Sequence, residues 1–123
     1  ICLSDEEKVV NFYIDRIGAN SSIIKSKTTK EHIKIPAKRL DETVKNKKIK
    51  LLKIDAEGSE PEVLKGCKNI IDNIEYISVD CGAERGMSEV TTFKEVYEIL
   101  NDYNFSIIDI YQQRFTVLFK NKA

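Results

Sequence analysis

One stretch decides the fold of this chain, residues 51–66: Leu-Leu-Lys-Ile-Asp-Ala-Glu-Gly-Ser-Glu-Pro-Glu-Val-Leu-Lys-Gly. An apolar run ends in an acidic turn, and the turn opens directly into a predicted helix. Ser59 and Glu62 have the spacing of a capping box, and Pro61 suits the first helical turn, where its missing N–H costs nothing. A strand that leads through a charged turn into a helix is typical of open α/β sheets, which bind ligands at the carboxyl ends of their strands.

Hydrophobic patterns on both sides of this stretch predict further strands and helices. The predicted strands are residues 9–15, 32–37, 49–54, 76–79, 105–110 and 115–119, and the predicted helices begin near residues 40, 59 and 92. Residues 49–54 and 76–79 are short apolar runs of the kind found in buried parallel strands. From residue 49 onward, the alternation of strand and helix predicts parallel crossovers. The last two strands are close enough to pair as an antiparallel hairpin.

Composition narrows the classes of function. The 123 residues fit one domain, and 20 basic against 20 acidic side chains give a formal net charge of zero. We therefore expect neither nucleic acid nor a membrane surface as a partner. The sequence contains no apolar run long enough to span a bilayer and no signal-peptide pattern. The three cysteines have unrelated spacings, which predicts free thiols in the cytoplasm rather than a disulfide framework or a zinc site.

Residues 53–66 closely resemble the central motif of the FkbM-type methyltransferases, which use S-adenosylmethionine. Weaker similarities cover residues 1–5 and 10–13, the small-residue loop at 18–22, and the Leu-Asp-Glu step at 40–42. The resemblance implies the carboxyl-terminal half of a Rossmann-like class I methyltransferase sheet, an α/β fold that is mostly parallel with a terminal antiparallel hairpin. Residues 1–123 would then form a single, partial methyltransferase domain.

The cofactor loop of that family is imitated only in part by residues 15–20, Asp-Arg-Ile-Gly-Ala-Asn. Such a loop needs closely spaced glycines, so that the backbone can approach the cofactor at a helix N-terminus. Here Ser21 and Ser22 follow, and the second glycine is missing. We interpret this segment as an ordinary loop and expect the cofactor loop upstream of Ile1.

Three candidate catalytic residues, Asp55, Glu57 and Lys53, stand at the end of the central predicted strand. Strand-end carboxylates can touch a ligand or act as a general base, or they can merely stabilise the positive end of the following helix. The resemblance implies that this turn faces the methyl-transfer pocket. A buried Lys53 could deprotonate an acceptor hydroxyl because desolvation lowers its pKa, and pairing with a carboxylate is the alternative.

The other candidates lie in two polar segments. The resemblance implies that Ser4 and Asp5 lie near the adenine of the cofactor, and a plain polar turn is the alternative. Asp80, Glu84 and Arg85 follow the next predicted strand and suggest an acceptor-binding loop, or else a solvated connector. Many members of the family have Glu where this chain has Asp80. Two acids at neighbouring strand ends can bind Mg²⁺, but we predict no metal site here.

The predicted function is transfer of a methyl group from S-adenosylmethionine to a hydroxyl of a sugar or small metabolite. The acceptor would be a small molecule or a glycan, and we expect the fragment alone to be inactive. The alternative is a truncated, non-catalytic α/β interaction module. A phosphotransferase is disfavoured because no P-loop is present. Half of a doubly wound sheet would expose an apolar edge and face, so we also expect the fragment to form a homo-oligomer.

Overall fold

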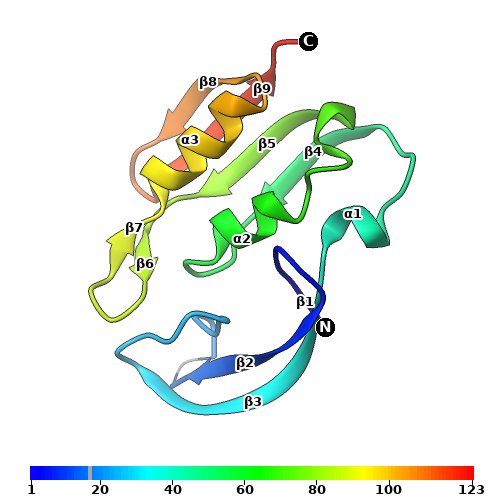
Figure 1. The fold of residues 1–123 in the computed structure, drawn as a ribbon. Coiled ribbons are helices and arrows are strands. Elements are labelled where there is room, and N and C mark those ends of the chain that lie inside the picture. The colour runs from blue at the N-terminus through cyan, green and yellow to red at the C-terminus, as the bar shows by residue number, and fades with distance from the viewer. Residues whose placement is uncertain (17) are drawn as a thin grey trace.

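The computed structural model describes residues 1–16 and 18–123, which form three β-sheets and short helices (Figure 1). The described strands are β1 (Cys2–Leu3), β2 (Lys8–Asp15), β3 (Thr29–Lys38), β4 (Ile49–Ile54), β5 (Ile74–Asp80), β6 (Ala83–Arg85), β7 (Val90–Thr91), β8 (Phe105–Tyr111) and β9 (Thr116–Asn121). The described helices are α1 (Leu40–Thr43), α2 (Glu60–Lys65), α3 (Phe93–Asp102) and a 3₁₀ turn at Ile71–Asn73. Residue 17, which belongs to the predicted loop 15–20, lies outside the described residues.

The main sheet has the strand order β4-β5-β9-β8. β4 and β5 are parallel, whereas β9 is antiparallel to both of its neighbours, β5 and β8. The expectation of a mostly parallel, Rossmann-like half sheet is therefore wrong, and the protein is a small α/β fold with mixed sheets. The physical reason is the tight turn at residues 112–115: it returns the chain directly, so β8 and β9 form the predicted hairpin and β9 takes the place beside β5.

A second sheet, with the order β1-β3-β2, lies beyond the carboxyl end of β4 (Figure 1). β2 and β3 pair antiparallel from Lys8 opposite Ala37 to Asp15 opposite Thr29, and β1 adds to β3 in parallel. The strands predicted at residues 9–15 and 32–37 are thus present. Because they satisfy each other's backbone groups along a long ladder, they form a sheet of their own rather than joining the main one.

α2 and α3 cover one face of the main sheet (Figure 1). The core between them is apolar and almost fully buried; it includes Ile54, Ile77, Val79, Val117 and Phe119 from the strands and Val63, Leu64, Val96 and Leu100 from the helices. Val96 and Leu100 are four positions apart on α3 and therefore share one side of the helix. Each such side chain contributes about 1.5–3 kcal/mol through its burial, and together they fix the strand ends that carry the candidate site.

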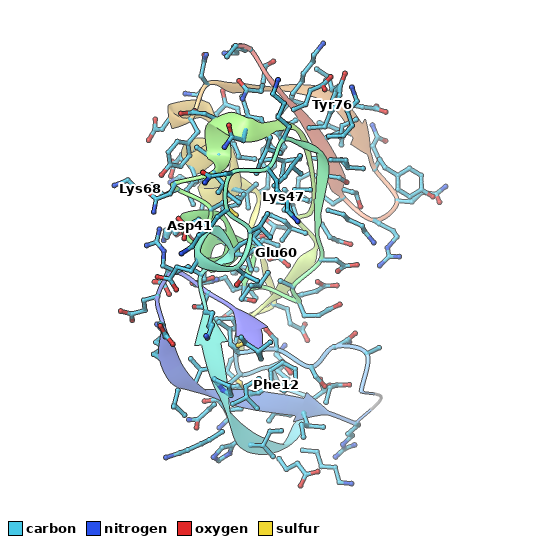
Figure 2. The ribbon with its side chains drawn as sticks, turned by 90° about the vertical axis from the view of Figure 1, so that its right-hand side faces the viewer. Phe12, Asp41, Lys47, Glu60, Lys68 and Tyr76 are labelled. Atoms are coloured by element: carbon cyan, nitrogen blue, oxygen red, sulfur yellow. The ribbon has the colours of Figure 1, made fainter. Side chains whose placement is uncertain are left out.

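The opposite face of the main sheet is open to solvent. Leu51 of β4 lies opposite Tyr76 of β5 on this face, and Leu51 is 54% exposed. The ammonium groups of Lys50 and Lys120 lie 5.3 and 5.7 Å from the centre of the Tyr76 ring, which is labelled in Figure 2. β4 is consequently a half-exposed edge strand, and the expectation of a buried strand at residues 49–54 is wrong. Self-association through exposed apolar surface stays a prediction.

Candidate functional site

The candidate site begins at the turn between β4 and α2. Glu57 and Gly58 have φ angles of 49° and 95°, and the N–H of Ser59 donates to the carbonyl of Ala56 at 3.1 Å. The Ser59 hydroxyl donates to the same carbonyl at 2.8 Å. Ser59 precedes α2 as predicted, but its side chain makes no capping hydrogen bond to the helix. The predicted capping box is therefore absent, because the hydroxyl of Ser59 bonds backward and Glu62 is engaged elsewhere.

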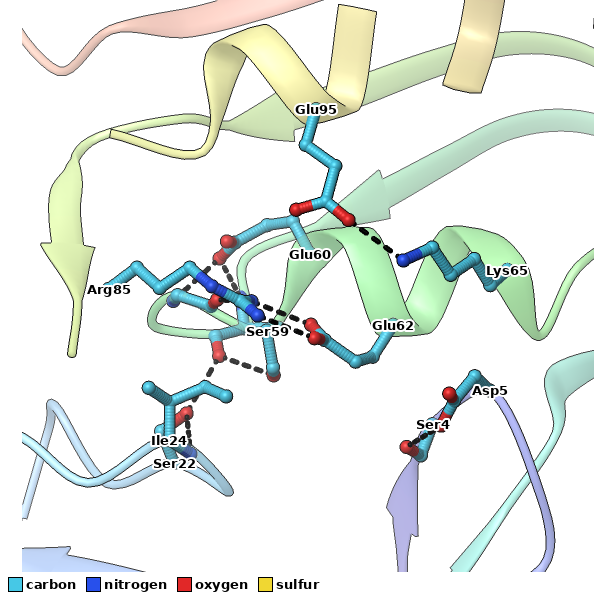
Figure 3. A network of polar contacts seen from close by, with 12 residues as sticks. Ser4, Asp5, Ser22, Ile24, Ser59, Glu60, Glu62, Lys65, Arg85 and Glu95 are labelled. Carbon is cyan, nitrogen blue, oxygen red and sulfur yellow. Dashed lines mark hydrogen bonds and ion pairs between the residues drawn. The ribbon is translucent and has the colours of Figure 1, made fainter. Parts of the chain in front are cut away.

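Glu60 holds this turn from inside the fold. It is 1% exposed, and its Oε1 accepts the N–H groups of Ala56 at 3.0 Å and Gly58 at 3.1 Å (Figure 3). Burial raises the pKa of the Glu60 carboxyl in spite of these two hydrogen bonds. A single side chain thus fixes the backbone on both sides of Glu57.

Glu57 and Glu84 bring two carboxyl groups together above the strand ends. Burial raises the pKa of Glu57 to about 7, and the neighbouring charges of Glu84 and Asp55 add to the shift. Burial, together with the charge of Asp80, also raises the pKa of Glu84. A carboxyl group with a pKa near 7 can accept a proton at neutral pH, which is what a general base needs.

Arg85 and Asp80, near Glu57 and Glu84, are both held by polar contacts to other residues. The guanidinium of Arg85 donates to both carboxylate oxygens of Glu62 at 2.7 and 2.8 Å and to the carbonyl of Gly58 at 2.6 Å. The side chain of Asp80 is 6% exposed, accepts the N–H of Gly82 at 3.0 Å and lies 3.6 Å from Arg114. Of the three residues predicted to bind the acceptor, Glu84 lies beside Glu57, whereas Arg85 is bound to Glu62 of α2. Asp80 and Glu84 also line a neighbouring cavity of about 440 Å³.

Lys53 and Asp55 line a separate cavity of about 290 Å³ between the end of β4 and the second sheet. The Lys53 side chain is 67% exposed, and its ammonium lies 3.7 Å from Asp55 Oδ2. The premise of a buried Lys53 is wrong, because β4 is an edge strand. Ser22, which is 4% exposed, also lines this cavity and donates to the carbonyl of Ala56 at 3.2 Å. The cavity is mostly apolar and lies at the small end of the usual range for ligand sites.

Ser4 and Asp5 lie away from this cavity, near the C-terminal end of α2. Ser4 is fully buried, and its hydroxyl donates to Asp5 at 2.9 Å. Burial alone would raise the pKa of Asp5, but hydrogen bonds from Ser4 and Lys8 outweigh it and leave the pKa below its ordinary value. A Cβ on Gly66, just after α2, would collide with the carbonyl oxygen of Ser4. The structure therefore places Ser4 and Asp5 in a different cavity from Asp55, one that Glu62 also lines.

Comparison with known proteins adds one finding to this geometry. A family model described as the methyltransferase FkbM domain matches residues 4–107. The chain belongs to the FkbM methyltransferase domain family. No curated protein and no solved structure matches the chain. The matched range contains every predicted site residue, so the resemblance found in the sequence is confirmed and supports methyl transfer at the level of the family.

Methyltransferases of the FkbM family generally use S-adenosylmethionine. Gly18, Gly58, Gly66, Gly82 and Gly86 stand singly and outside the helices and strands, and in residues 1–16 and 18–123 no close pair of glycines opens a helix. Within the same residues no group of three or more His, Cys, Asp or Glu side chains is placed to hold a metal ion. No described helix is both long and apolar enough to cross a membrane.

Sequence reasoning missed several residues of the site. Glu60 and Glu62 look like ordinary members of an acidic helix start, yet one fixes the turn and the other binds Arg85. Ser22 lies 34 positions before Ala56, and only the folded chain brings them together. Of these residues, only Glu60 could have been recognised from the sequence. Pro61 directly after it places Glu60 at the first turn of the helix, where a carboxylate can reach free N–H groups.

Proposed function

We propose that this FkbM domain serves the transfer of a methyl group from S-adenosylmethionine to a hydroxyl oxygen of a sugar or small metabolite. Membership of the family supports methyl transfer. The choice of a hydroxyl acceptor rests on Glu57, whose raised pKa of about 7 suits it to take a proton from a weak acid at neutral pH. A hydroxyl needs this help because it must lose its proton when its oxygen is methylated.

Each group of the site has a part on the acceptor side in this proposal. Glu57 accepts the hydroxyl proton, and its proton affinity is raised by burial and further by the adjacent charge of Glu84. Asp55, which lines the 290 Å³ cavity, orients the acceptor by hydrogen bonding to its polar groups. Orientation of this kind supplies much of the rate enhancement of a transfer reaction. The exposed ammonium of Lys53, which lies 3.7 Å from Asp55 Oδ2, can bind an anionic part of the acceptor.

The finer expectations belong to the same proposal. They are S-adenosylmethionine as donor, a cytoplasmic location, and an acceptor that is a small molecule or a glycan rather than nucleic acid or a membrane. A cofactor glycine loop before Ile1 also stays a prediction.

The test is methyl transfer by the full-length protein. S-adenosylmethionine with a labelled methyl group is incubated with a panel of glycans and small metabolites that carry hydroxyl groups. The Glu57→Gln variant should lose about 100-fold or more of the transfer rate, because the side chain can no longer take the proton. Glu98→Gln, at an exposed position of α3, is the matched control and should keep the rate. Equal rates for Glu57→Gln and the wild type would show that Glu57 is not the base.

A second candidate function, the non-catalytic interaction module, is favoured by one observation. The described residues lack the close glycines that a cofactor loop needs. Calorimetric titration with S-adenosylhomocysteine separates the two candidates. Binding by the full-length protein supports the enzyme, and absence of binding supports the module. Equally tight binding by residues 1–123 alone would show that the expected glycine loop before Ile1 is not needed.

A further inference from the structure

Arg85 fastens the segment after β5 to the turn after β4. Its guanidinium makes a two-point ion pair with Glu62 of α2, at 2.7 and 2.8 Å, and a third hydrogen bond to the carbonyl of Gly58 at 2.6 Å (Figure 3). The side chains of Arg85 and Glu62 are only 27% and 18% exposed. A two-point pair between arginine and a carboxylate fixes direction as well as distance, and partial burial protects it from screening.

Backbone contact strengthens the same connection. A Cβ built on Gly58 would lie 2.8 Å from the Cα of Arg85, so β6 lies directly against the turn. Only a glycine allows this approach, and the φ of Gly58 is itself positive at 95°. The hydrogen bonds of Arg85 to Glu62 and Gly58 are called the Arg85 clasp here. The position of β6 relative to the turn is therefore set both by this clasp and by close backbone packing.

The clasp has a consequence for the residue that precedes it. Glu84 and Arg85 are consecutive in β6, and Glu57 and Gly58 are consecutive in the turn. Fastening Arg85 to Gly58 brings Glu84 against Glu57, and the two carboxyl groups interact strongly. Below about pH 7 the proton on Glu57 lets it donate to the Glu84 carboxylate, and above that pH the two charges repel, so the attachment of Arg85 has to keep them close.

We propose that Arg85 is a positioning residue, which through its clasp to Glu62 and Gly58 holds the carboxyl group of Glu84 beside that of Glu57. Arg85 then acts on the proton-accepting pair without touching the acceptor. This inference rests on the proposed function only for the use of the pair as a base. The geometry of the pair can be tested without any methyl transfer, so the two ideas can fail separately.

The charged groups around Glu57 and Glu84 allow an experiment to separate a positional effect of Arg85 from an effect of its charge. Glu57 faces Glu84 of β6, Asp55 at the end of β4 and Glu60 of α2, and Glu84 also faces Asp80 at the end of β5. Removing the positive charge of Arg85 would, by charge alone, raise the pKa of nearby carboxyl groups. Releasing Glu84 from Glu57 would instead lower the pKa of Glu57. The two explanations predict opposite signs for one measurement.

The experiment is a pH titration of Glu57, followed by carbon-13 NMR of its carboxyl group in the wild type and in variants. Arg85→Gln should lower the pKa of Glu57 from about 7 by about one pH unit or more. Glu62→Asp keeps the charge of the partner but shortens its reach, and should lower the pKa in the same direction. Lys65→Gln is the control: it breaks the 2.8 Å pair between Lys65 and Glu95, which joins α2 to α3 without touching β6, and should leave the titration unchanged.

A combined variant shows whether the effect passes through Glu84. Glu84→Gln by itself should lower the pKa of Glu57, and adding Arg85→Gln to it should then change little. A pKa of Glu57 that stays at about 7 or rises in Arg85→Gln would overturn the proposal. An equal fall with and without Glu84 would overturn it as well. If Arg85→Gln does not fold, Glu62→Asp and the combination of Glu62→Asp with Glu84→Gln provide the same comparison.

Discussion

The carboxylate of Glu60 accepts the backbone N–H of Gly58 at 3.1 Å, and Glu60 is only 1% exposed. The first residue of a helix thus bonds back to the turn that precedes it. The same oxygen accepts the N–H of Ala56 at 3.0 Å, and Glu57 lies between these two fixed points. The turn that carries the proposed base is therefore held by a side chain that solvent hardly reaches.

This relationship predicts the effect of shortening Glu60. Glu60→Ala leaves two buried N–H groups without an acceptor and should lower the free energy of unfolding by about 2–4 kcal/mol. Glu60→Gln keeps an oxygen at the same place and should cost clearly less. Urea unfolding of both variants measures the difference. Equal losses would mean that the turn does not depend on these hydrogen bonds.

Two glycines with positive φ form a matched pair for a second prediction. Gly58→Ala places a Cβ 2.8 Å from the Cα of Arg85, in addition to the strain at φ 95°. At Gly86, φ is 74° and a Cβ would meet nothing within 4 Å. Gly86→Ala should therefore cost about 1 kcal/mol from backbone strain alone, and Gly58→Ala about 1–3 kcal/mol more. Thermal or urea unfolding measures the two losses in the free energy of unfolding. Equal losses would contradict the close packing of β6 on the turn.

The raised pKa of Glu57 predicts a dependence of stability on pH. The folded protein holds a proton on Glu57 up to about pH 7, whereas the unfolded chain releases it near the ordinary value of 4.5. The contribution of this group to stability is therefore fully present below about pH 4.5 and is lost as the pH rises through about 7. The free energy of unfolding of the wild type should fall relative to that of Glu57→Gln between these two values.

Urea unfolding at a series of pH values measures this difference, and Glu98→Gln serves as the control at an exposed position. The wild type and Glu98→Gln should change with pH in parallel. A wild type that runs parallel to Glu57→Gln as well would show that Glu57 titrates near its ordinary value.

Much of the local structure could be predicted from the sequence, because local patterns determine it. The strand at residues 49–54, the helix that follows Ser59 and the terminal hairpin are where the hydrophobic periods and turn residues indicate. Val63 and Leu64 of the helix after Ser59 are buried, and α2 ends at Lys65. Gly66 follows the last residue of α2 and lies against the carbonyl oxygen of Ser4, a contact that no local pattern reveals.

The pairing of strands and the detailed site could not be predicted in the same way. An apolar run such as residues 49–54 reads alike in a central strand and in a half-exposed edge strand, and only the neighbours decide which it is. The expected burial of Lys53 failed for this reason. Asp55, Glu57 and Glu84 were predicted from their place after strands, whereas the pairing of Arg85 with Glu62 depends on a contact across 23 positions.

The central claim is that the turn from Asp55 to Gly58 faces the site of methyl transfer. The most direct measurement is titration of the isotope-labelled full-length protein with S-adenosylhomocysteine, followed by the backbone amide signals in NMR. The account predicts saturable shifts of the Ala56 and Gly58 amides, which Glu60 holds in place. Saturable binding that leaves these two amides unmoved and shifts only distant signals, such as those of the open sheet face around Tyr76, would contradict it.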